Sequence, residues 1–362
     1  MWAVRDPDRY TTALRGSHRV SSRVEVWSDG ALLTPAALFT DGAVTDKWVP
    51  AGIRRTLELT VPPNTDWLKW LVLPLLELRP YRGIRYSDSE IEECPLGRYP
   101  LLMPTQSRPI GSIKLQSDDY YQRVIQAGFT SPYRTDTKRA ADQAAELFGG
   151  FTGMRPVVIT STDPAQSLGT ILEKTRHDAM VDLAKSFSLE ITVDREGVPT
   201  VADEQVLDDA WTVALLVGGD FGVLEELAVK PDWDKVFNAV SVTSTAKDVH
   251  FAPQLASITD PDNPAAPWRI GSRVKNHSSP LIPDADSGLA AAESILRRLS
   301  QSAITYSYTC IPDVRIDGGD TIRGTTMTGL ATAQVAEITH PLTAEGRQQI
   351  TTVSTQPDIS DE

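Results

Sequence analysis

Alternation of hydrophobic and polar positions marks strands along the first 125 residues of the chain. Apolar side chains recur at every second position in residues 23–34 and 53–63, the period of half-buried strands. The Asp29-Gly30 pair predicts a hairpin turn. Two further strands, joined at residues 87–89, are expected within residues 81–101. Short strands separated by Gly, Pro and Asp favour a barrel or a sandwich.

Helical periodicity follows after residue 128. Residues 135–150 predict a short helix with a Thr or Asp cap and a glycine stop. Apolar residues spaced three and four apart, from Leu168 through Ile171 and Leu172 to Phe187, predict one long helix. A hairpin with its turn at residues 195–197 comes next. Residues 126–210 are therefore expected to form an α+β insert between β segments.

The β pattern returns at residues 211–245. Residues 251–287 are rich in Pro, Asp and Asn and too long for an ordinary loop, so they predict a small subdomain or a binding loop. An amphipathic helix is expected at residues 288–302. Strands follow, including one on each side of "DGGD", and the acidic end "DISDE" is expected to fray.

One polar residue stands out within the segment "DKVFNAVSVTST". Asn238 shares a strand face with Val236, Val240 and Val242. A buried amide without partners would cost about 1–3 kcal/mol. Asn238 must therefore either fasten neighbouring backbone or take part in chemistry.

Composition and charge narrow the class of protein. Hydrophobic residues make up 41% of the 362 residues and charged residues 23%, as in ordinary globular proteins. No apolar run is long enough to span a membrane, and the N-terminus lacks a secretory signal, so we expect synthesis in a cytoplasm. The formal net charge of −13 argues against bound nucleic acid. Cys94 and Cys310 are expected as two buried thiols rather than a disulfide.

No pattern typical of catalysis emerges. The five histidines lack metal-ligand spacing, and no phosphate-binding, dinucleotide or nucleophile motif is present, so neither a metal nor a cofactor is expected. Two carboxylates can in principle form a glycosidase pair, but 48 acidic residues make chance pairs common. "DGGD" fits a tight turn better, in which Gly318 and Gly319 supply positive φ and Asp320 caps loop amides. We expect no enzyme.

The order of the landmarks resembles the tail-hub proteins of tailed bacteriophages. The strand "VFNAVSV", the helix "GLAAAESILRRLSQ" and the turn "DGGDTIRG" match that family's strand, alanine-rich helix and Gly-Asp turn. Residues 14–20 and the segment "ECPLGRYPL", with Pro95 and Gly97, resemble a domain of minor tail proteins of actinobacterial phages.

The resemblance implies a mainly β fold with α+β inserts. Residues 1–125 would form one tube-like β domain, and residues 211–248 with 303–357 a second. Residues 126–210 and 249–302 would be peripheral inserts, and 358–362 a frayed tail. Three copies would present six tube-like domains and so match a sixfold tail tube to a threefold tip.

The resemblance also implies a function and partners. The chain would be a structural hub at the distal end of the virion tail, a homotrimer that contacts the tail tube, distal tail protein, tape measure protein and tip fibres or receptor-binding proteins. DNA would pass its acidic channel without specific binding. Asn238 would then bridge backbone groups at the start of its strand.

Two alternatives remain. The first is a carbohydrate- or receptor-binding module, for which Trp268 is the first residue to test. The second is a wall-degrading hydrolase, with Asp118/Asp119, Glu225/Glu226 or Asp317/Asp320 as the acid pair.

Overall fold

The computed structural model describes most of the chain. The described residues are 4–73, 75–101, 105–106, 111–135, 139–152, 156–160, 165–166, 169, 171–172, 175–205, 207, 212–219, 222–231, 233–261, 263–300, 304–326 and 329–357. The expected frayed tail, 358–362, lies outside them.

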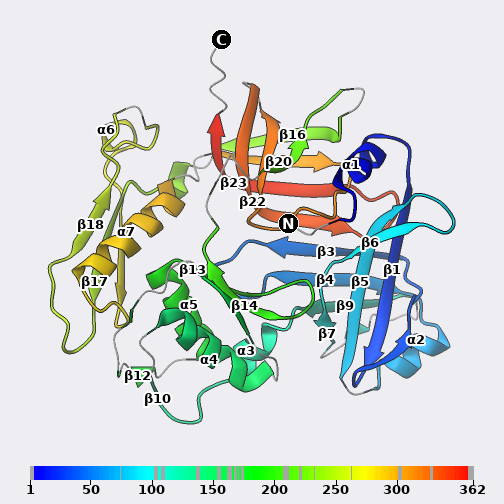
Figure 1. Cartoon of the computed structure of the whole chain (residues 1–362), viewed down its shortest axis with the longest axis horizontal. Coiled ribbons are helices and arrows are strands. Elements are labelled where there is room, and N and C mark those ends of the chain that lie inside the picture. The colour runs from blue at the N-terminus through cyan, green and yellow to red at the C-terminus, as the bar shows by residue number, and fades with distance from the viewer. Residues whose placement is uncertain are drawn as a thin grey trace.

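A first core lies between two sheets in the part of the molecule near the N-terminus (Figure 1). One sheet has the order β2-β1-β5-β6, with β7 paired to β5. Its strands are β1 (Arg19–Ser28), β2 (Ala31–Thr34), β5 (Leu76–Arg85), β6 (Ile91–Pro95) and β7 (Tyr99–Pro100). Helices α1 (Pro7–Arg15) and α2 (Thr65–Trp70) add Tyr10, Leu14 and Trp67 to the core. The turn at Asp29 and Gly30 has positive φ at both residues, as the sequence pattern requires.

A ten-stranded sheet joins the two ends of the chain. Its main path is β16-β20-β23-β22-β3-β4-β9-β8, with β21 paired to β22 and β15 to β21. The early strands are β3 (Asp41–Lys47), β4 (Arg55–Val61), β8 (Thr105–Gln106) and β9 (Ile113–Asp118). The late ones are β15 (Thr212–Leu216), β16 (Leu224–Pro231), β20 (Ile304–Cys310), β21 (Thr321–Thr326), β22 (Gly329–Pro341) and β23 (Gln348–Pro357). The antiparallel pair β3–β22 makes both groups one sheet.

A small α+β unit packs below this sheet in Figure 1. It contains the helices α3 (Gln122–Gln126), α4 (Ala140–Thr152) and α5 (Arg176–Phe187), the pair β10 (Tyr133–Arg134) and β12 (Ile171–Leu172), and the sheet β11 (Val157–Ile159), β14 (Pro199–Asp203) and β13 (Leu189–Val193). The predicted hairpin at residues 195–197 joins β13 to β14. Helix α5 starts with a capping box between Thr175 and Asp178.

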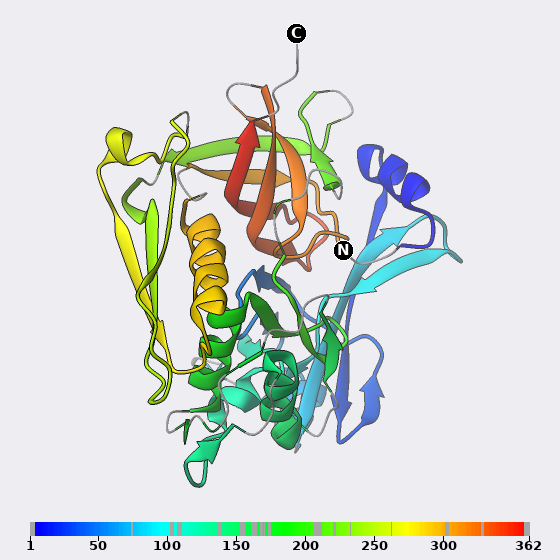
Figure 2. The ribbon, with the colours of Figure 1, turned by 60° about the vertical axis from the view of Figure 1, so that its left-hand side comes forward.

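A three-stranded blade stands at the side of the molecule (Figure 2). Its order is β18 (Gln254–Ser257), β17 (Ala239–Ser244) and β19 (Val274–Ser279). Helix α7 (Ala285–Ser300) packs on the inner face against Val240 and Val242, and the short helix α6 (Pro267–Ile270) lies at one end. The 3-10 turn η2 (Trp233–Lys235) precedes the blade. The long proline-rich passage thus contributes β18, α6 and β19 to the blade.

The mainly β character expected from the sequence is confirmed. Among the described residues, four separate clusters of buried side chains form the cores of the sandwich, the α+β unit, the late strands and the blade. The exact division at residues 125, 210, 248 and 302 stays a prediction. The strand pairing adds that β17, which the boundary at 248 assigns to the second β domain, pairs with β18 and β19 of the expected insert.

The helix expected from Leu168 to Phe187 is wrong in its first half. Ile171 and Leu172 form β12, which pairs with β10, and α5 begins only at Arg176. Leu168 lies outside the described residues. The strand expected before "DGGD" is also absent, since residues 313–320 are loop and turn, whereas β21 follows as expected. Helix α1 is an addition, although Asp6 as N-cap and Pro7 at the first position were readable signals.

Both cysteines are free and buried. No helix in the described part of the chain has the length and apolar character needed to cross a membrane.

Candidate functional site

Buried charged side chains from three parts of the chain meet at Asp317. Its carboxylate accepts hydrogen bonds from Arg55 Nη2 of β4 at 3.0 Å and from Arg195 Nε of the β13–β14 turn at 2.8 Å. Arg195 is 2% exposed and also donates to the carbonyl oxygens of Val314, at 2.7 Å, and Ile316, at 2.9 Å. Arg195 therefore ties the α+β unit to the loop that leads into β21.

Asp46 and Arg54 extend this cluster into the first sandwich. Arg54 Nε lies 3.0 Å from Asp46 Oδ1, and Arg55 Nη2 lies 3.0 Å from Asp46 Oδ2. Arg54 also donates to the carbonyl oxygen of Gly318. Burial alone would raise the pKa of Asp317, but Arg195, Arg55 and Arg54 outweigh it and hold this pKa well below the usual range.

Asp119 holds the two arginines in position through their backbone. Its Oδ2 accepts from the backbone N–H of Arg54 at 2.9 Å and of Arg55 at 2.8 Å, and its Oδ1 accepts from that of Tyr121 at 2.9 Å. Burial raises the pKa of Asp119 to about 6 against these hydrogen bonds. The Asp119 carboxylate therefore pairs the backbone N–H groups at the start of β4.

Glu190 is a further buried carboxylate of this cluster. It is 5% exposed on β13 and accepts a hydrogen bond from Trp48 Nε1. Burial raises its pKa to about 7, with Arg54 opposing and the nearby carboxylates Glu204 and Asp46 reinforcing the rise. We call this set the charged junction; its members are Asp46, Arg54, Arg55, Asp119, Glu190, Arg195, Asp317 and Asp320.

Burial is the main cause of the raised pKa values in the charged junction, and nearby carboxylates add to it at Glu190 and Asp320. Asp320, whose Oδ2 accepts from the backbone N–H of Asp317 at 2.8 Å, also has a raised pKa, from burial and then from the charge of Asp317. Breaking one partner of a buried ion pair leaves the other uncompensated. The charged junction joins β4, the β13–β14 turn and the loop before β21 through bonds to Asp317.

The Gly-Gly turn of "DGGD" fits closely against the first sandwich. Gly319 has φ +87°, and a Cβ there would lie 2.8 Å from the Trp48 ring and closer still to Gln205. A Cβ at Gly318 would lie 2.9 Å from the backbone nitrogen of Trp48. Gly319 is therefore needed both for its positive φ and for close approach. The positive φ expected at Gly318 is wrong, and glycine is needed there for close approach alone.

Pro95, one of the residues selected in the N-terminal segment, lies beside Arg195 of the charged junction, and Gly97 follows two residues later. The carbonyl oxygen of Pro95 accepts from Arg195 Nη1 at 3.4 Å. Gly97 has φ +134°, and a Cβ there would lie 2.5 Å from the hydroxyl oxygen of Tyr99. Arg195 thus contacts both Pro95 and Asp317, the residue before Gly318, although Pro95 and Asp317 are more than 200 residues apart.

Asn238 lies elsewhere, just before β17 in the blade, and is fully buried. Its Nδ2 donates to the carbonyl oxygen of Gly271 at 2.6 Å, and its Oδ1 accepts from the backbone N–H of Arg273 at 2.8 Å. The amide therefore joins the entry to β17 with the segment that leads into β19. These contacts are of the backbone-bridging kind.

Trp268 is 59% exposed in α6, at one end of the blade. Asn238 contacts Gly271, the C-cap of this helix, through the backbone carbonyl oxygen. No group of three or more His, Cys, Asp or Glu residues with metal-binding geometry occurs in the described part of the chain.

The ten-stranded sheet has one polar, partly exposed face that runs across both halves of the chain. Register aligns two rows of side chains on it, and we call these rows the polar face: Glu226, Thr309, Gln349, Thr339, Thr45, Thr56 and Asp118; and Ala228, Ser307, Thr351, Glu337 and Lys47. Hydrogen bonds link neighbours across the strands: the hydroxyls of Thr45 and Thr339 lie 3.3 Å apart, and Thr309 donates to Gln349 at 3.1 Å.

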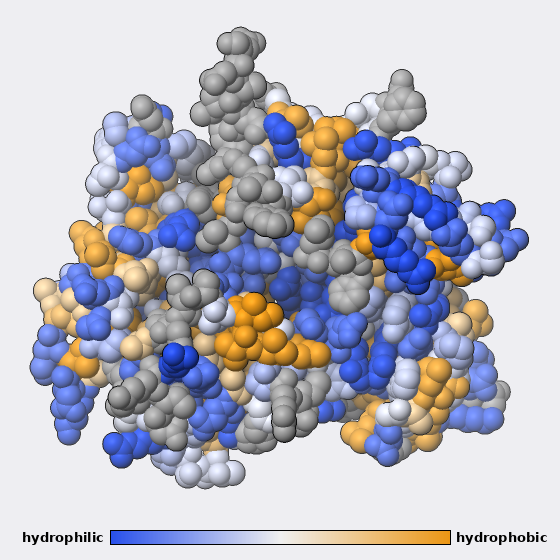
Figure 3. Space-filling view, viewed as in Figure 1, coloured by the Kyte–Doolittle hydropathy of each residue, from blue (hydrophilic) through white to orange (hydrophobic). Residues whose placement is uncertain are grey.

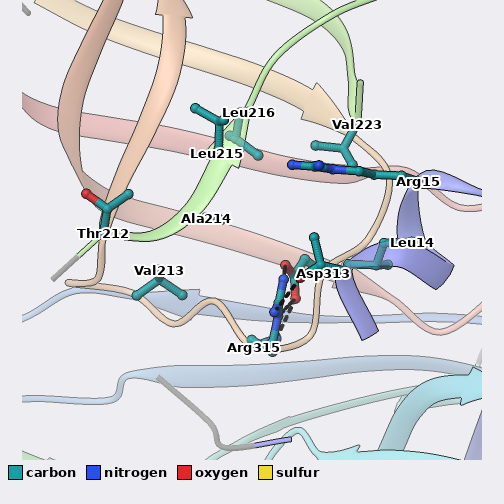
Figure 4. Close-up of a pocket in the computed structure, with 11 residues that line it drawn as sticks. Leu14, Arg15, Thr212, Val213, Ala214, Leu215, Leu216, Val223, Asp313 and Arg315 are labelled. Carbon is teal, nitrogen blue, oxygen red and sulfur yellow. Dashed lines mark hydrogen bonds and ion pairs between the residues drawn. The ribbon is translucent and has the colours of Figure 1, made fainter. Parts of the chain in front are cut away.

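A cavity of about 270 Å³ lies between α1 and β15. Figure 4 shows Arg15 reaching from the end of α1 past Val223 toward β15, with the paired Asp313 and Arg315 below. We call this cavity the β15 groove; its walls are Thr11, Leu14, Arg15, the strand β15, Val223, Asp313 and Arg315. The sequence analysis predicted neither the β15 groove nor the arginines of the charged junction. Each is formed by residues that lie far apart in the sequence and meet only in the folded chain.

Solved structures supply the comparison. No protein-family model matches the chain, and no curated protein matches it by sequence. A tail protein from Neisseria meningitidis MC58 superposes with a TM-score of 0.66 at 14% identity, covering 94% of this chain and 98% of the other. The chain has the fold of phage tail proteins.

Other tail proteins agree with this fold. The 43 kDa tail protein of prophage MuSo2 from Shewanella oneidensis gives a TM-score of 0.59 at 14% identity, covering 91% of this chain and 98% of that one. Prophage tail protein gp18 from Listeria monocytogenes gives 0.57 at 11% identity, with 93% and 95% covered. The tail-protein fold expected from the resemblance is thereby confirmed, hub-like in architecture.

Proposed function

We propose that this chain is a structural hub of a phage tail tip, a homotrimer that joins the sixfold tail tube to threefold tip structures and lines the DNA exit channel. Its neighbours in the virion would be the tail tube, the distal tail protein, the tape measure protein and tip fibres or receptor-binding proteins. Its tail-protein fold supports this role. The chain would act without catalysis.

The polar face carries the proposal. A single sheet that continues from β16 to β9 presents hydroxyl and amide side chains across both halves of the chain. The opposite side of the same strands is buried, with Tyr308, Ile350 and Ile338 in one row. A protein that lines a water-filled channel needs this division, with one side packed and one side wet.

The charges of the polar face suit a channel through which DNA passes. Glu226, Asp118 and Glu337 are acidic, and Lys47 is paired with Glu337 at 3.3 Å. DNA binding depends on clustered Lys and Arg. The polar face carries hydroxyl groups and a small excess of acidic groups, so DNA would move past it without binding. In a trimer this face would turn inward.

An apolar end of the first sandwich suits contact with another tail protein. Leu68, Val72, Leu73 and Leu75 are 39–80% exposed around α2, and the apolar surface there is visible at the lower right of Figure 3. Contiguous apolar surface of this kind marks interaction sites in soluble proteins.

Immunogold electron microscopy tests the proposal. Antibody against this chain should label purified virions at the distal tail tip only, and antibody against a capsid protein serves as the matched control. Sedimentation of the purified chain, or of its complex with tail-tube protein, should show three copies. Virions that carry no label, with the chain free in the lysate, would refute the hub.

A carbohydrate-binding role is the second candidate, favoured by one observation. Trp268 offers an exposed indole at the end of the blade, and such rings stack on sugars in binding sites. The hub and this role are compatible, since a tail tip contacts the cell surface.

A further inference from the structure

The β15 groove has the geometry of a strand-addition site. β15 pairs with β21 on one side, and among the described residues no strand covers its other edge. Successive side chains of a strand point to opposite faces. A cavity that touches all five residues from Thr212 to Leu216 therefore lies along the strand's edge. Over residues 213–216 the described part of the chain supplies no backbone hydrogen bond to this edge, so N–H and C=O groups there are available for pairing.

The remaining walls define the chemistry of an occupant. Leu14, Val213, Leu216 and Val223 make the groove largely apolar. Arg315 is neutralised by Asp313, whose oxygens lie 2.7–3.2 Å from its guanidinium, and also donates to the hydroxyl of Thr11. The groove thus offers apolar contacts together with a backbone edge.

Arg15 is the charged side chain of the β15 groove that an occupant could bind. It is exposed, and it forms no hydrogen bond or ion pair with the described residues. A basic residue also suits the C-terminal end of α1, so its charge alone would mean little. Arg15 lies beside the open edge of β15 and opposite the apolar walls. A peptide bound along β15 would therefore be favoured if it carries a carboxylate next to Arg15.

We propose that the β15 groove binds an extended segment of a partner protein, which adds as a strand to the free edge of β15 and places a carboxylate against Arg15. Peptides recognised by strand addition gain affinity from backbone hydrogen bonds and specificity from alternate side chains. A volume of about 270 Å³ accommodates a few side chains rather than a folded domain. The proposal does not depend on the hub assembly.

Fluorescence anisotropy with defined peptides tests this. The probes are labelled, end-blocked TVTVD and DVTVT, so that either strand direction is sampled, together with the Asn analogue and an N-methylated form of the better binder. Replacing Asp by Asn should weaken binding about three- to fivefold, as expected for an exposed ion pair. N-methylation should weaken it at least tenfold, because it removes edge hydrogen bonds.

Two variants complete the experiment. Arg15→Gln should abolish the difference between the Asp and Asn peptides, whereas Arg19→Gln, which removes an exposed charge on β1 outside the groove, should retain it. The proposal fails if binding does not saturate by 5 mM, if the N-methylated peptide binds equally, or if Arg15→Gln preserves the preference. Self-association of the chain alone that is lost in Arg15→Gln would make the occupant a second copy and overturn the partner assigned here.

Discussion

Replacing Glu190 by Gln should remove a loss of stability of about 2–3 kcal/mol that Glu190 contributes between pH 5 and 8. Glu190 is 5% exposed in the charged junction, and burial raises its pKa from 4.5 to about 7. Each tenfold change in proton affinity is worth about 1.4 kcal/mol, so keeping this side chain ionised in the folded state costs about 3 kcal/mol. Gln has the same shape and can still accept the hydrogen bond from Trp48.

The number of bound protons determines whether the free energy of unfolding rises or falls with pH. Between about pH 4.5 and 7 the folded protein binds more protons than the unfolded chain, so its stability falls as the pH rises. The contribution of Glu190 is fully present below pH 4.5 and is lost as the pH passes 7. Asp119, with a pKa raised from 3.8 to about 6, adds a loss of the same sign at lower pH. The lowered pKa of Asp317 acts in the opposite direction, but only below pH 3.8.

Urea unfolding followed at pH 5, 6, 7 and 8 measures this effect. The free energies of unfolding of the wild type and Glu190→Gln should be close at pH 5, and the variant should be more stable by about 2–3 kcal/mol at pH 8. Glu58→Gln, which neutralises an exposed acid on β4, serves as the control. If the domains unfold separately, hydrogen exchange of the β13 amides gives the local value. A wild-type slope that persists in Glu190→Gln would refute the reasoning.

Further variants separate the structural roles. Asp317→Asn should lower the free energy of unfolding by about 3–5 kcal/mol, because two buried guanidinium groups lose their partner; a loss below 1 kcal/mol in urea would contradict this. Asn238→Ala should cost about 2–3 kcal/mol by leaving buried backbone groups unpaired, and an unchanged melting temperature would count against it. Gly319→Ala should lower the melting temperature more than the control Gly219→Ala, which also has positive φ but no neighbour within 4 Å. Trp268→Ala should leave the melting temperature unchanged; glycan-array binding that survives this substitution would remove Trp268 as a sugar contact.

Local patterns predicted the elements whose signals are local. The alternation around Leu57 and Leu59 predicts β4, whose residues are alternately buried and partly exposed. The spacing of Leu289, Ala292, Leu296 and Leu299 predicts α7. The face that this helix buries is rotated, because it is centred on Ala291, Ala292 and Ile295, and Leu289 is 38% exposed. The first half of the helix expected before Phe187 failed because its apolar residues pair with a strand near residue 133, and a helical spacing of a few residues cannot reveal that partner.

The charged junction shows why the site was less predictable than the fold. Arg55 and Arg195 look like ordinary exposed arginines in the sequence, and only the meeting of β4, the β13–β14 turn and the "DGGD" loop buries them. The Gly-Asp turn was readable because positive φ demands glycine locally. Its close approach to Trp48, which explains why Gly318 is a glycine without positive φ, could not be predicted.

The pairing of β3 with β22 has a consequence for synthesis of the chain. Thr45 and Thr339 are 294 residues apart, and a ribosome adds about 5–20 residues per second. The edge of β3 therefore waits roughly 15–60 s for its partner on a nascent chain, while Arg55 waits a comparable time for Asp317. Because unpaired edges and unsatisfied charges favour misassembly, the first half of this protein should depend on chaperone protection until its last strands emerge.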